Sequence, residues 1–426
     1  MSEITMAYGR SGMRVQLNDA WQADVIRKPP MPVLADPVAV LEDALDKPVS
    51  APPLAQLAAT ARSVCIVICD ITRPVPNGVI LPVLVRRLLA AGVKPEAITV
   101  LIATGLHRPN EGAEMAAVVG DATVLRTVRV VNHFARRDEE HVTLGTTTRG
   151  TPVRLDRRLV EADLRIVVGL VEPHFMAGYS GGRKLLAPGV AHADTITSFH
   201  HVRLLEHPLA TNAVLDGNPL HDELLQIAAM TGNVYAVNVV LDEERHLTSV
   251  NFGALLPSHA EAVACMRKYA ERKMTRTYDV VLTSSAGYPL DLTYYQTCKG
   301  VVSALGALRP GGKLFIVSEC REGIGSPEFR EAQSRLVRDG AEAFMAYLHS
   351  LPRAPVDAWQ TEMLCKALRH GSVHLYSPGL PAGDWGCTGV HRVQNLEQEL
   401  AAAVAASSDQ TLAVIPEGPY VIPMAP

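Results

Sequence analysis

Short apolar runs alternate with helical patterns along the first half of the chain. The run RSVCIVIC, residues 62–69, is rich in β-branched residues and predicts a buried strand. The next stretch, residues 76–93, has the apolar spacing of a helix, with Gly92 near its end. The alternation continues through AITVLIATG, TVRVVNH and DLRIVVGLVEPH. Strands that alternate with helices are typical of βαβ units built around a parallel sheet.

A second α/β pattern begins after the polar stretch ERKMTRT, residues 271–277. A new strand is expected at YDVVLTSS, a helix from about Thr293, and further strands at KLFIVSE, SVHLYS and TLAVIP. We therefore predict an α/β protein of two α/β domains with mainly parallel sheets and a cleft between them. The predicted boundaries are 1–272 and 273–426, and the extreme C-terminus is allowed to return to the first domain.

Composition and charge narrow the class of protein. The 426 residues are 48% hydrophobic and 20% charged, which is ordinary for a soluble globular protein. The net charge is −4 and no long block of Lys and Arg occurs, so nucleic acid is not expected as a partner. Neither a secretory signal nor a membrane span is found, and the seven cysteines are scattered without a CxxC pair. A cytoplasmic protein without a membrane partner is expected.

Polar side chains follow several of the predicted strands. The strand ends carry DITRPVPN from Asp70, ATGLHRP up to Pro109, EPHF from Glu172 and SAGYPLDLTYYQTCKG in the second half. Ligands bind beyond the carboxyl ends of strands in open α/β sheets. The alternative is that these residues have no role in function: Asp70 and Thr72 would only cap the following helix, and the histidines at the strand ends would be structural. The strand ends all offer side chains suited to one anionic ligand, and this agreement favours a ligand-binding site over capping and structural roles.

The glycine-rich segment 172–201 contains one lysine, one arginine and four histidines, all of which can bind ligands or take part in catalysis. GYSGGRK lets backbone N–H groups turn towards an anion, and a helix beginning near Arg183 would add its positive end, which predicts a phosphate cradle. The spacings of a P-loop and of GxGxxG are absent. Lys184 lies among small apolar residues that would lower its pKa and free it as a nucleophile; the alternative is a surface lysine. No HExxH pattern supports a zinc protease.

The motifs DITRP, GLHRP, EPHFMAGYSGGRKLLAPG, FHH and GYPLDLTYYQTCKG together resemble the nickel-pincer lactate racemase family over nearly the whole chain. The resemblance implies a nickel-pincer nucleotide, pyridinium-3-thioamide-5-thiocarboxylic acid mononucleotide with Ni(II), joined covalently to Lys184. His200 would complete the nickel site. The remaining implied cofactor-binding residues are Asp70, Thr72, Tyr179, Ser180, Gly181 and Gly182.

The same resemblance implies the roles of the substrate site. His107 and His174 would act as acid and base, and Trp359 would belong to the pocket wall. The substrate-binding residues would be Arg73, Tyr295, Gln296 and Lys299. The implied enzyme is a racemase or epimerase that inverts C2 of a 2-hydroxy acid, lactate or a close analogue, by reversible proton-coupled hydride transfer. Cofactor-biosynthesis proteins would be its partners.

Two other classes of function stay open from the sequence. One is a metal-dependent lyase or hydrolase that uses the same histidines. The other is a non-catalytic protein that binds or stores a nucleotide or cofactor. Storage needs no acid–base pair, so His107 and His174 count against the second class.

Overall fold

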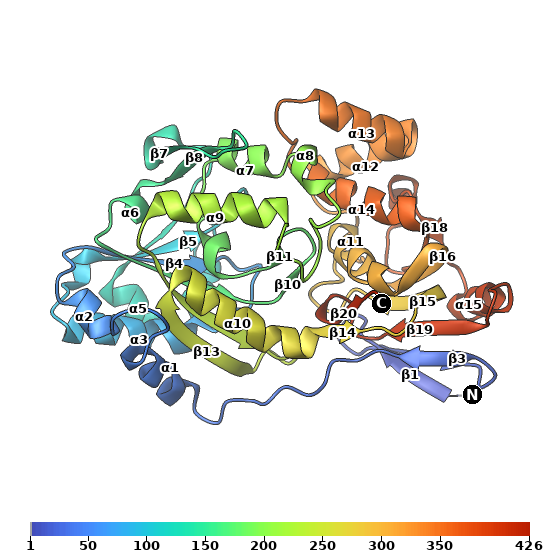
Figure 1. Ribbon diagram of the computed structural model, residues 1–426, viewed down its shortest axis with the longest axis horizontal. Helices are drawn as coiled ribbons and strands as arrows, with labels where there is room; N and C mark the ends of the chain where they lie inside the picture. Colours follow the sequence, from blue (N-terminus) through green and yellow to red (C-terminus); the bar gives the residue numbers. More distant parts are fainter. Residues whose placement is uncertain (1) are drawn as a thin grey trace.

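The computed structural model describes residues 2–426 and contains two six-stranded sheets, each flanked by helices (Figure 1). The first sheet has the order β13-β12-β9-β4-β5-β6, and all its pairs are parallel except β12 with β13. Its strands are β4 (Val64–Cys69), β5 (Ile98–Ala103), β6 (Arg129–Asn132), β9 (Leu164–Leu170), β12 (Tyr235–Leu241) and β13 (Leu247–Ala254).

The second sheet has the order β18-β17-β16-β15-β19-β3 and is parallel throughout. Its strands are β3 (Gln22–Val25), β15 (Tyr278–Ser284), β16 (Leu308–Val317), β17 (Ser372–Tyr376), β18 (His391–Arg392) and β19 (Thr411–Ile415). The prediction of an α/β fold with mainly parallel sheets is confirmed.

The helices cover both faces of the two sheets (Figure 1). Those around the first sheet are α1 (Pro37–Asp46), α2 (Leu54–Ala58), α3 (Asn77–Ala90), α4 (Ala113–Val119), α5 (Ala122–Thr127), α6 (Arg157–Val160), α7 (Ala193–Phe199), α9 (Pro219–Thr231) and α10 (Leu255–Ala270). Helix α8 (Val202–Leu205) lies between the units, where Val202 packs in the core of the second. Those around the second are α11 (Tyr294–Ser303), α12 (Pro327–Asp339), α13 (Ala341–Ser350), α14 (Ala358–His370) and α15 (Leu396–Ala405).

The N-terminal segment lies with the second sheet, which corrects the assignment of residues 1–272 to one domain. Strand β3 pairs in parallel with β19, and the hairpin of β1 (Ser2–Met6) and β2 (Met13–Leu17) packs against the hydrophobic core of that sheet. A sequence pattern identifies a strand but not its neighbour, and here the neighbour comes from the opposite end of the chain. The position of the boundary near residue 272 stays a prediction.

The extreme C-terminus reaches back to the first unit. Strand β20 (Ile422–Met424) pairs with β14 (Glu271–Lys273), and Ile422 packs in one cluster with Val171 and Tyr179 of the first unit. The segment therefore ties the two units together beside the glycine-rich stretch.

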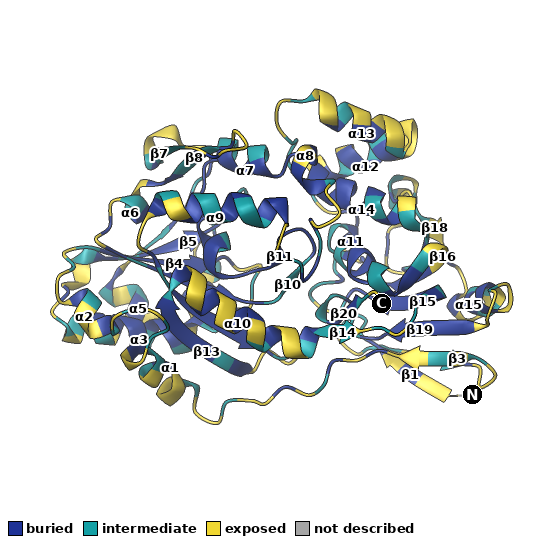
Figure 2. Cartoon of the chain, viewed as in Figure 1, coloured by how far each residue is buried: buried dark blue, intermediate teal, exposed yellow. Residues whose placement is uncertain are grey.

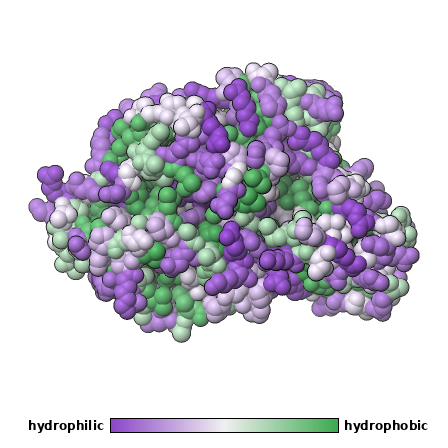
Figure 3. All heavy atoms as spheres, viewed as in Figure 1, coloured by the Kyte–Doolittle hydropathy of each residue, from purple (hydrophilic) through white to green (hydrophobic). Residues whose placement is uncertain are grey.

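Burial follows the strands. All six residues of β4 and all five of β19 are buried, as expected for strands covered on both faces (Figure 2). Polar residues spread across the face of both units in Figure 3, with hydrophobic residues between them. Among residues 2–426, none of the helices combines the length and the apolar character that crossing a bilayer requires.

Candidate functional site

A cavity of about 280 Å³ opens between the carboxyl ends of β4, β5 and β9 and the first turns of α11 and α14. This volume is close to the lower end of ligand pockets, which is about 300 Å³. The two units both contribute to its wall. Most of the predicted site residues line it, namely Asp70, Thr72, Arg73, His107, His174, Ser180, Gly181, Lys184, His200, Tyr295, Gln296, Lys299 and Trp359.

Two of the predicted cofactor-binding residues, Tyr179 and Gly182, are not part of this wall. The Tyr179 side chain is fully buried and its hydroxyl donates a hydrogen bond to Glu271 Oε1 at 2.6 Å. Gly182 packs against α10 so closely that a Cβ would lie 2.8 Å from His259 Cδ2. Both residues support the glycine-rich segment from behind.

The helix expected near Arg183 is only a single 3-10 turn, η3 (Gly182–Leu185). The Arg183 guanidinium is completely buried and donates to the carbonyl oxygens of Ala177 and Tyr179 at 3.0 and 3.2 Å. Burial lowers the pKa of Arg183 to about 9. Arg183 therefore braces the segment from within, and the expected helix dipole at this position is absent.

Asp70 and His107 are joined at the ends of two neighbouring strands. His107 Nδ1 lies 2.7 Å from Asp70 Oδ2, and the Thr72 hydroxyl donates to Asp70 Oδ1 at 2.6 Å. Burial favours a raised pKa for Asp70, but the hydrogen bonds from His107 and Thr72 outweigh it and the pKa is lowered. Helix α3 begins only at Asn77, so Asp70 and Thr72 do not cap it. The carboxylate fixes the His107 proton on Nδ1 and leaves Nε2 for exchange with a ligand.

His174 lies on the short hairpin of β10 (Pro173–His174) and β11 (Gly178–Tyr179). Its Nδ1 accepts hydrogen bonds from the backbone N–H groups of Met176 and Ala177, both at 3.3 Å. The neutral ring therefore carries its proton on Nε2, which is 3.2 Å from Lys184 Nζ. Burial, followed by the positive charge of Lys184, holds the pKa of His174 well below its usual value. In this state His174 presents an Nε2–H donor to the cavity.

The Lys184 amine is set up as a nucleophile. It keeps some accessible surface because it lines the cavity, yet protein atoms surround the amine on its other sides. This burial, together with repulsion from Arg73 and Arg183, lowers the pKa of Lys184 well below that of a surface lysine. A neutral amine in such a place can attack an electrophile, in agreement with the desolvation expected from its small apolar neighbours.

His200 ends α7 with one ring nitrogen held and the other free for a metal. Its Nδ1 donates to the Ile196 carbonyl oxygen at 2.9 Å, and burial lowers its pKa to about 3. Its ring lies against that of Trp359, with centroids 4.7 Å apart. A carbonyl on Nδ1 is the usual arrangement behind a ligating imidazole Nε2. Within residues 2–426, no three His, Cys, Asp or Glu side chains converge in a way that could hold a metal ion.

Two cationic side chains, Arg73 and Lys299, line the cavity where a carboxylate was expected to bind. Arg73 forms an ion pair with Glu172. Lys299 lies on α11, and burial together with repulsion from Arg73 lowers its pKa to about 7. Thr293 caps this helix by accepting a hydrogen bond from the Gln296 backbone N–H at 3.4 Å, and Tyr295 and Gln296 of its first turn line the cavity. An anionic ligand would offset the repulsion between the two cations.

Sequence reasoning missed the residues that precede and begin α14. Asp357 lines the cavity and accepts hydrogen bonds from the hydroxyls of Tyr295, at 3.3 Å, and Ser326, at 2.5 Å. Gln360 also lines it and donates from Nε2 to the Tyr295 carbonyl oxygen at 2.5 Å. Neither belongs to one of the motifs, and the signal that could have found them is their position beside Trp359, which the resemblance placed in the pocket wall.

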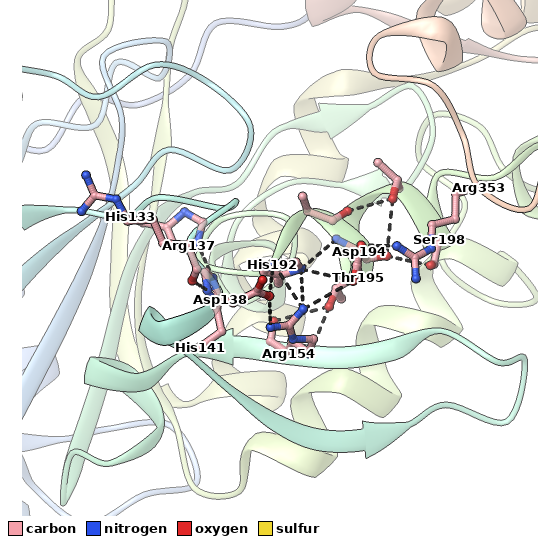
Figure 4. A network of polar contacts seen from close by, with 12 residues as sticks. His133, Arg137, Asp138, His141, Arg154, His192, Asp194, Thr195, Ser198 and Arg353 are labelled. Carbon is pink, nitrogen blue, oxygen red and sulfur yellow. Dashed lines mark hydrogen bonds and ion pairs between the residues drawn. The ribbon is translucent and has the colours of Figure 1, made fainter.

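The loop before α14 is bound to the first unit. Its Leu351 carbonyl accepts a hydrogen bond from His201 Nε2 at 2.9 Å, and its Ala354 N–H donates to the Thr197 carbonyl at 3.0 Å. Figure 4 shows Arg353 of this loop paired with Asp194, at the start of α7. These contacts hold Trp359 against His200.

The remaining histidines of the segment are structural. His192 and His201 are the N-caps of α7 and α8, where each accepts a hydrogen bond from a backbone N–H. His192 also belongs to the polar network with Arg154, Asp138 and His141 drawn in Figure 4. Neither histidine lines the cavity.

Comparisons with known proteins place the chain in one family. Residues 8–212 match the model of the lactate racemase N-terminal domain, and residues 273–423 match that of the lactate racemase C-terminal domain. The lactate racemase of Thermoanaerobacterium thermosaccharolyticum is 28% identical over 99% of both chains. The lactate racemase of Lactiplantibacillus plantarum is 30% identical over 90% of each chain.

Solved structures agree with these matches. The lactate racemase apoprotein from T. thermosaccharolyticum superimposes with a TM-score of 0.92, covering 99% of this chain and all of the other. A protein from Thermotoga maritima, 17% identical, shares the fold with a TM-score of 0.66 over 88% of this chain and 96% of its own.

Proposed function

The chain belongs to the lactate racemase family, as the motifs indicated, and we propose that it inverts C2 of lactate or a close 2-hydroxy acid. The observation that carries the proposal is the meeting of four side chains in one cavity. His107 and His174 each present Nε2, Lys184 presents an amine whose pKa burial holds well below its usual value, and His200 presents its second ring nitrogen. A storage protein would not need the two acid–base groups.

The side chains present fit the nickel-pincer nucleotide. Lys184 has the desolvated amine that a covalent link requires, and His200 has an imidazole donor that suits Ni(II) beside soft sulfur ligands. Asp70, Thr72, Ser180 and Gly181 line the same cavity. When bound, the nucleotide supplies a nickel centre and a carbon that can accept and return a hydride.

The protein's own residues would position the substrate and move its proton. Arg73, Gln296 and Lys299 bind the carboxylate, where a guanidinium offers two parallel N–H donors. His107, which carries its proton on Nδ1, takes the C2 hydroxyl proton on Nε2 as C2 becomes planar, and a proton returns to the oxygen when C2 is rebuilt from the other face. We expect the reaction in the cytoplasm, after the host's cofactor-biosynthesis proteins have loaded the enzyme.

The decisive experiment follows the hydrogen at C2. Loaded protein, verified by intact mass, is given L-lactate deuterated at C2 in ordinary water, and the product is analysed by NMR. Retention of most of the deuterium in racemised lactate is expected, since a transferred hydride does not exchange with water. A lyase, a hydrolase or simple proton abstraction by a histidine predicts loss of label or no racemisation, and either result would contradict the proposal.

A further inference from the structure

Arg73 is held by a carboxylate that is not part of the cavity wall. Arg73 lines the cavity, whereas Glu172 does not, and Arg73 Nη1 contacts Glu172 Oε1. Tyr420, in the 3-10 helix η6 (Gly418–Tyr420), is close enough to both side chains for their charges to act on its hydroxyl. Arg73 Nη1 is thus paired with a carboxylate that lies outside the cavity wall, and the other N–H groups of the guanidinium can bind a ligand.

The backbone of Glu172 is fixed on both sides by Ser180. The Glu172 N–H donates to Ser180 Oγ at 3.0 Å, and the Ser180 N–H donates to the Glu172 carbonyl at 2.9 Å. Ser180 Oγ in turn donates to the Leu170 carbonyl at 2.7 Å. The backbone that carries the Glu172 carboxylate is therefore held in place by hydrogen bonds.

The same short stretch of backbone also carries His174. Glu172 and His174 are two residues apart at the start of the β10–β11 hairpin, where Pro173 pairs with Tyr179. One short piece of backbone thus sets both a proton-transfer group and, through Arg73, the anchor of the substrate carboxylate.

We infer that Glu172 is a positioning residue, which fixes the plane of the Arg73 guanidinium and so aligns the substrate carboxylate with His174. This inference rests on the proposed function, because it assumes that Arg73 binds the carboxylate of a 2-hydroxy acid. A guanidinium recognises a carboxylate through a planar fork, so its orientation matters as well as its charge. Small errors in substrate placement weaken binding and turnover strongly.

The test compares Glu172→Ala and Glu172→Gln by binding and by turnover. The probe is 2-hydroxyisobutyrate, which has the carboxylate and hydroxyl of the substrate but no hydrogen at C2. Its Kd is measured by calorimetry on loaded protein. In Glu172→Ala we expect a Kd about 10-fold higher or more, an equal rise in KM for lactate, and a kcat about 10-fold lower or more because the carboxylate is no longer aligned with His174. In Glu172→Gln the amide oxygen still accepts from Arg73, so Kd, KM and kcat should each stay within about 3-fold of wild type.

The matched control is Glu42→Ala, which removes another carboxylate paired with an arginine, Arg87, at 3.1 Å outside the cavity. It should leave the Kd unchanged. An unchanged Kd in Glu172→Ala would overturn the inference, as would equal losses in the alanine and glutamine variants, which would show that charge and not orientation matters. Loss of the cofactor adduct or of thermal stability in Glu172→Ala would reassign Glu172 to the framework.

The Kd of 2-hydroxyisobutyrate tests the role of Glu172 separately from the proposed racemase activity. If the loaded wild-type protein binds 2-hydroxyisobutyrate but racemises no 2-hydroxy acid, the proposed function fails and the Kd values still decide the role of Glu172. If the wild-type protein does not bind the probe, both fail.

Discussion

Asp70 Oδ2 lies 2.7 Å from His107 Nδ1, so a buried carboxylate at the end of β4 orients an imidazole at the end of β5. The His107 side chain is 60% exposed while that of Asp70 is only 5% exposed. An imidazole this open to the cavity would rotate freely without a partner. The carboxylate fixes both the ring and its tautomer, and Nε2 remains the nitrogen that exchanges protons.

Asp70→Asn should therefore lower kcat by about 10²-fold or more, since an amide can donate to Nδ1 and favour the wrong tautomer. The lactate KM should change much less, because Asp70 does not reach the carboxylate site in our proposal. Racemisation kinetics on loaded enzyme provide the measurement. A kcat within 3-fold of wild type, which is about a 0.7 kcal/mol change in barrier, would remove the orienting role from Asp70.

His174→Gln should suppress turnover by about 10²- to 10⁴-fold while leaving the cofactor adduct in place. Glutamine is close in size, but it cannot take and return a proton. Intact mass gives the occupancy, and polarimetry gives the rate. Near-normal racemisation by a loaded variant would assign the proton transfer to another group.

Lys184→Arg should abolish the covalent adduct, because a guanidinium stays protonated and does not act as a nucleophile. Lys366→Arg is the matched control: Lys366 Nζ donates to the His207 and Ala210 carbonyls, outside the cavity wall, and burial lowers its pKa to about 8. Mass spectrometry should find the adduct in the control but not in the Lys184 variant. Full racemase activity in unmodified protein would contradict a covalent role.

Glu362 should make the protein less stable as pH rises. It is 1% exposed on α14, and burial raises its pKa from 4.5 to about 8. Between those two values the folded protein holds a proton that the unfolded chain has released, so the free energy of unfolding falls as pH increases. Glu362→Gln removes this dependence and should raise Tm more at pH 8.5 than at pH 5.

Thermal denaturation at several pH values measures the effect. Glu342→Gln, at an exposed position on α13, is the control and should leave the pH dependence of Tm unchanged. If Glu362→Gln shows the same slope of Tm with pH as the wild type, its carboxyl does not titrate in this range.

For several segments, only the tertiary structure shows which strand or side chain each one pairs with. The pattern of residues 22–25 shows that a strand is possible but says nothing of β19, which pairs with it from the far end of the chain. Similarly, Glu172 followed a predicted strand, but its pairing with Arg73 depends on how two loops meet. Asp357 and Gln360 enter the cavity only because the loop before α14 is bonded to the first unit.

The sequence by itself determined the α/β class and most of the cavity wall. Apolar runs that alternate with helices produce parallel strands, and the carboxyl ends of parallel strands meet at one edge, so Asp70, His107 and His174 converge without further information. Local motifs did not show which side of the glycine-rich segment faces the ligand. Tyr179 and Gly182 turned inwards because α10 and Glu271 pack behind them. Side-chain direction depends on neighbours that are distant in the sequence, and only the folded structure brings those neighbours into place.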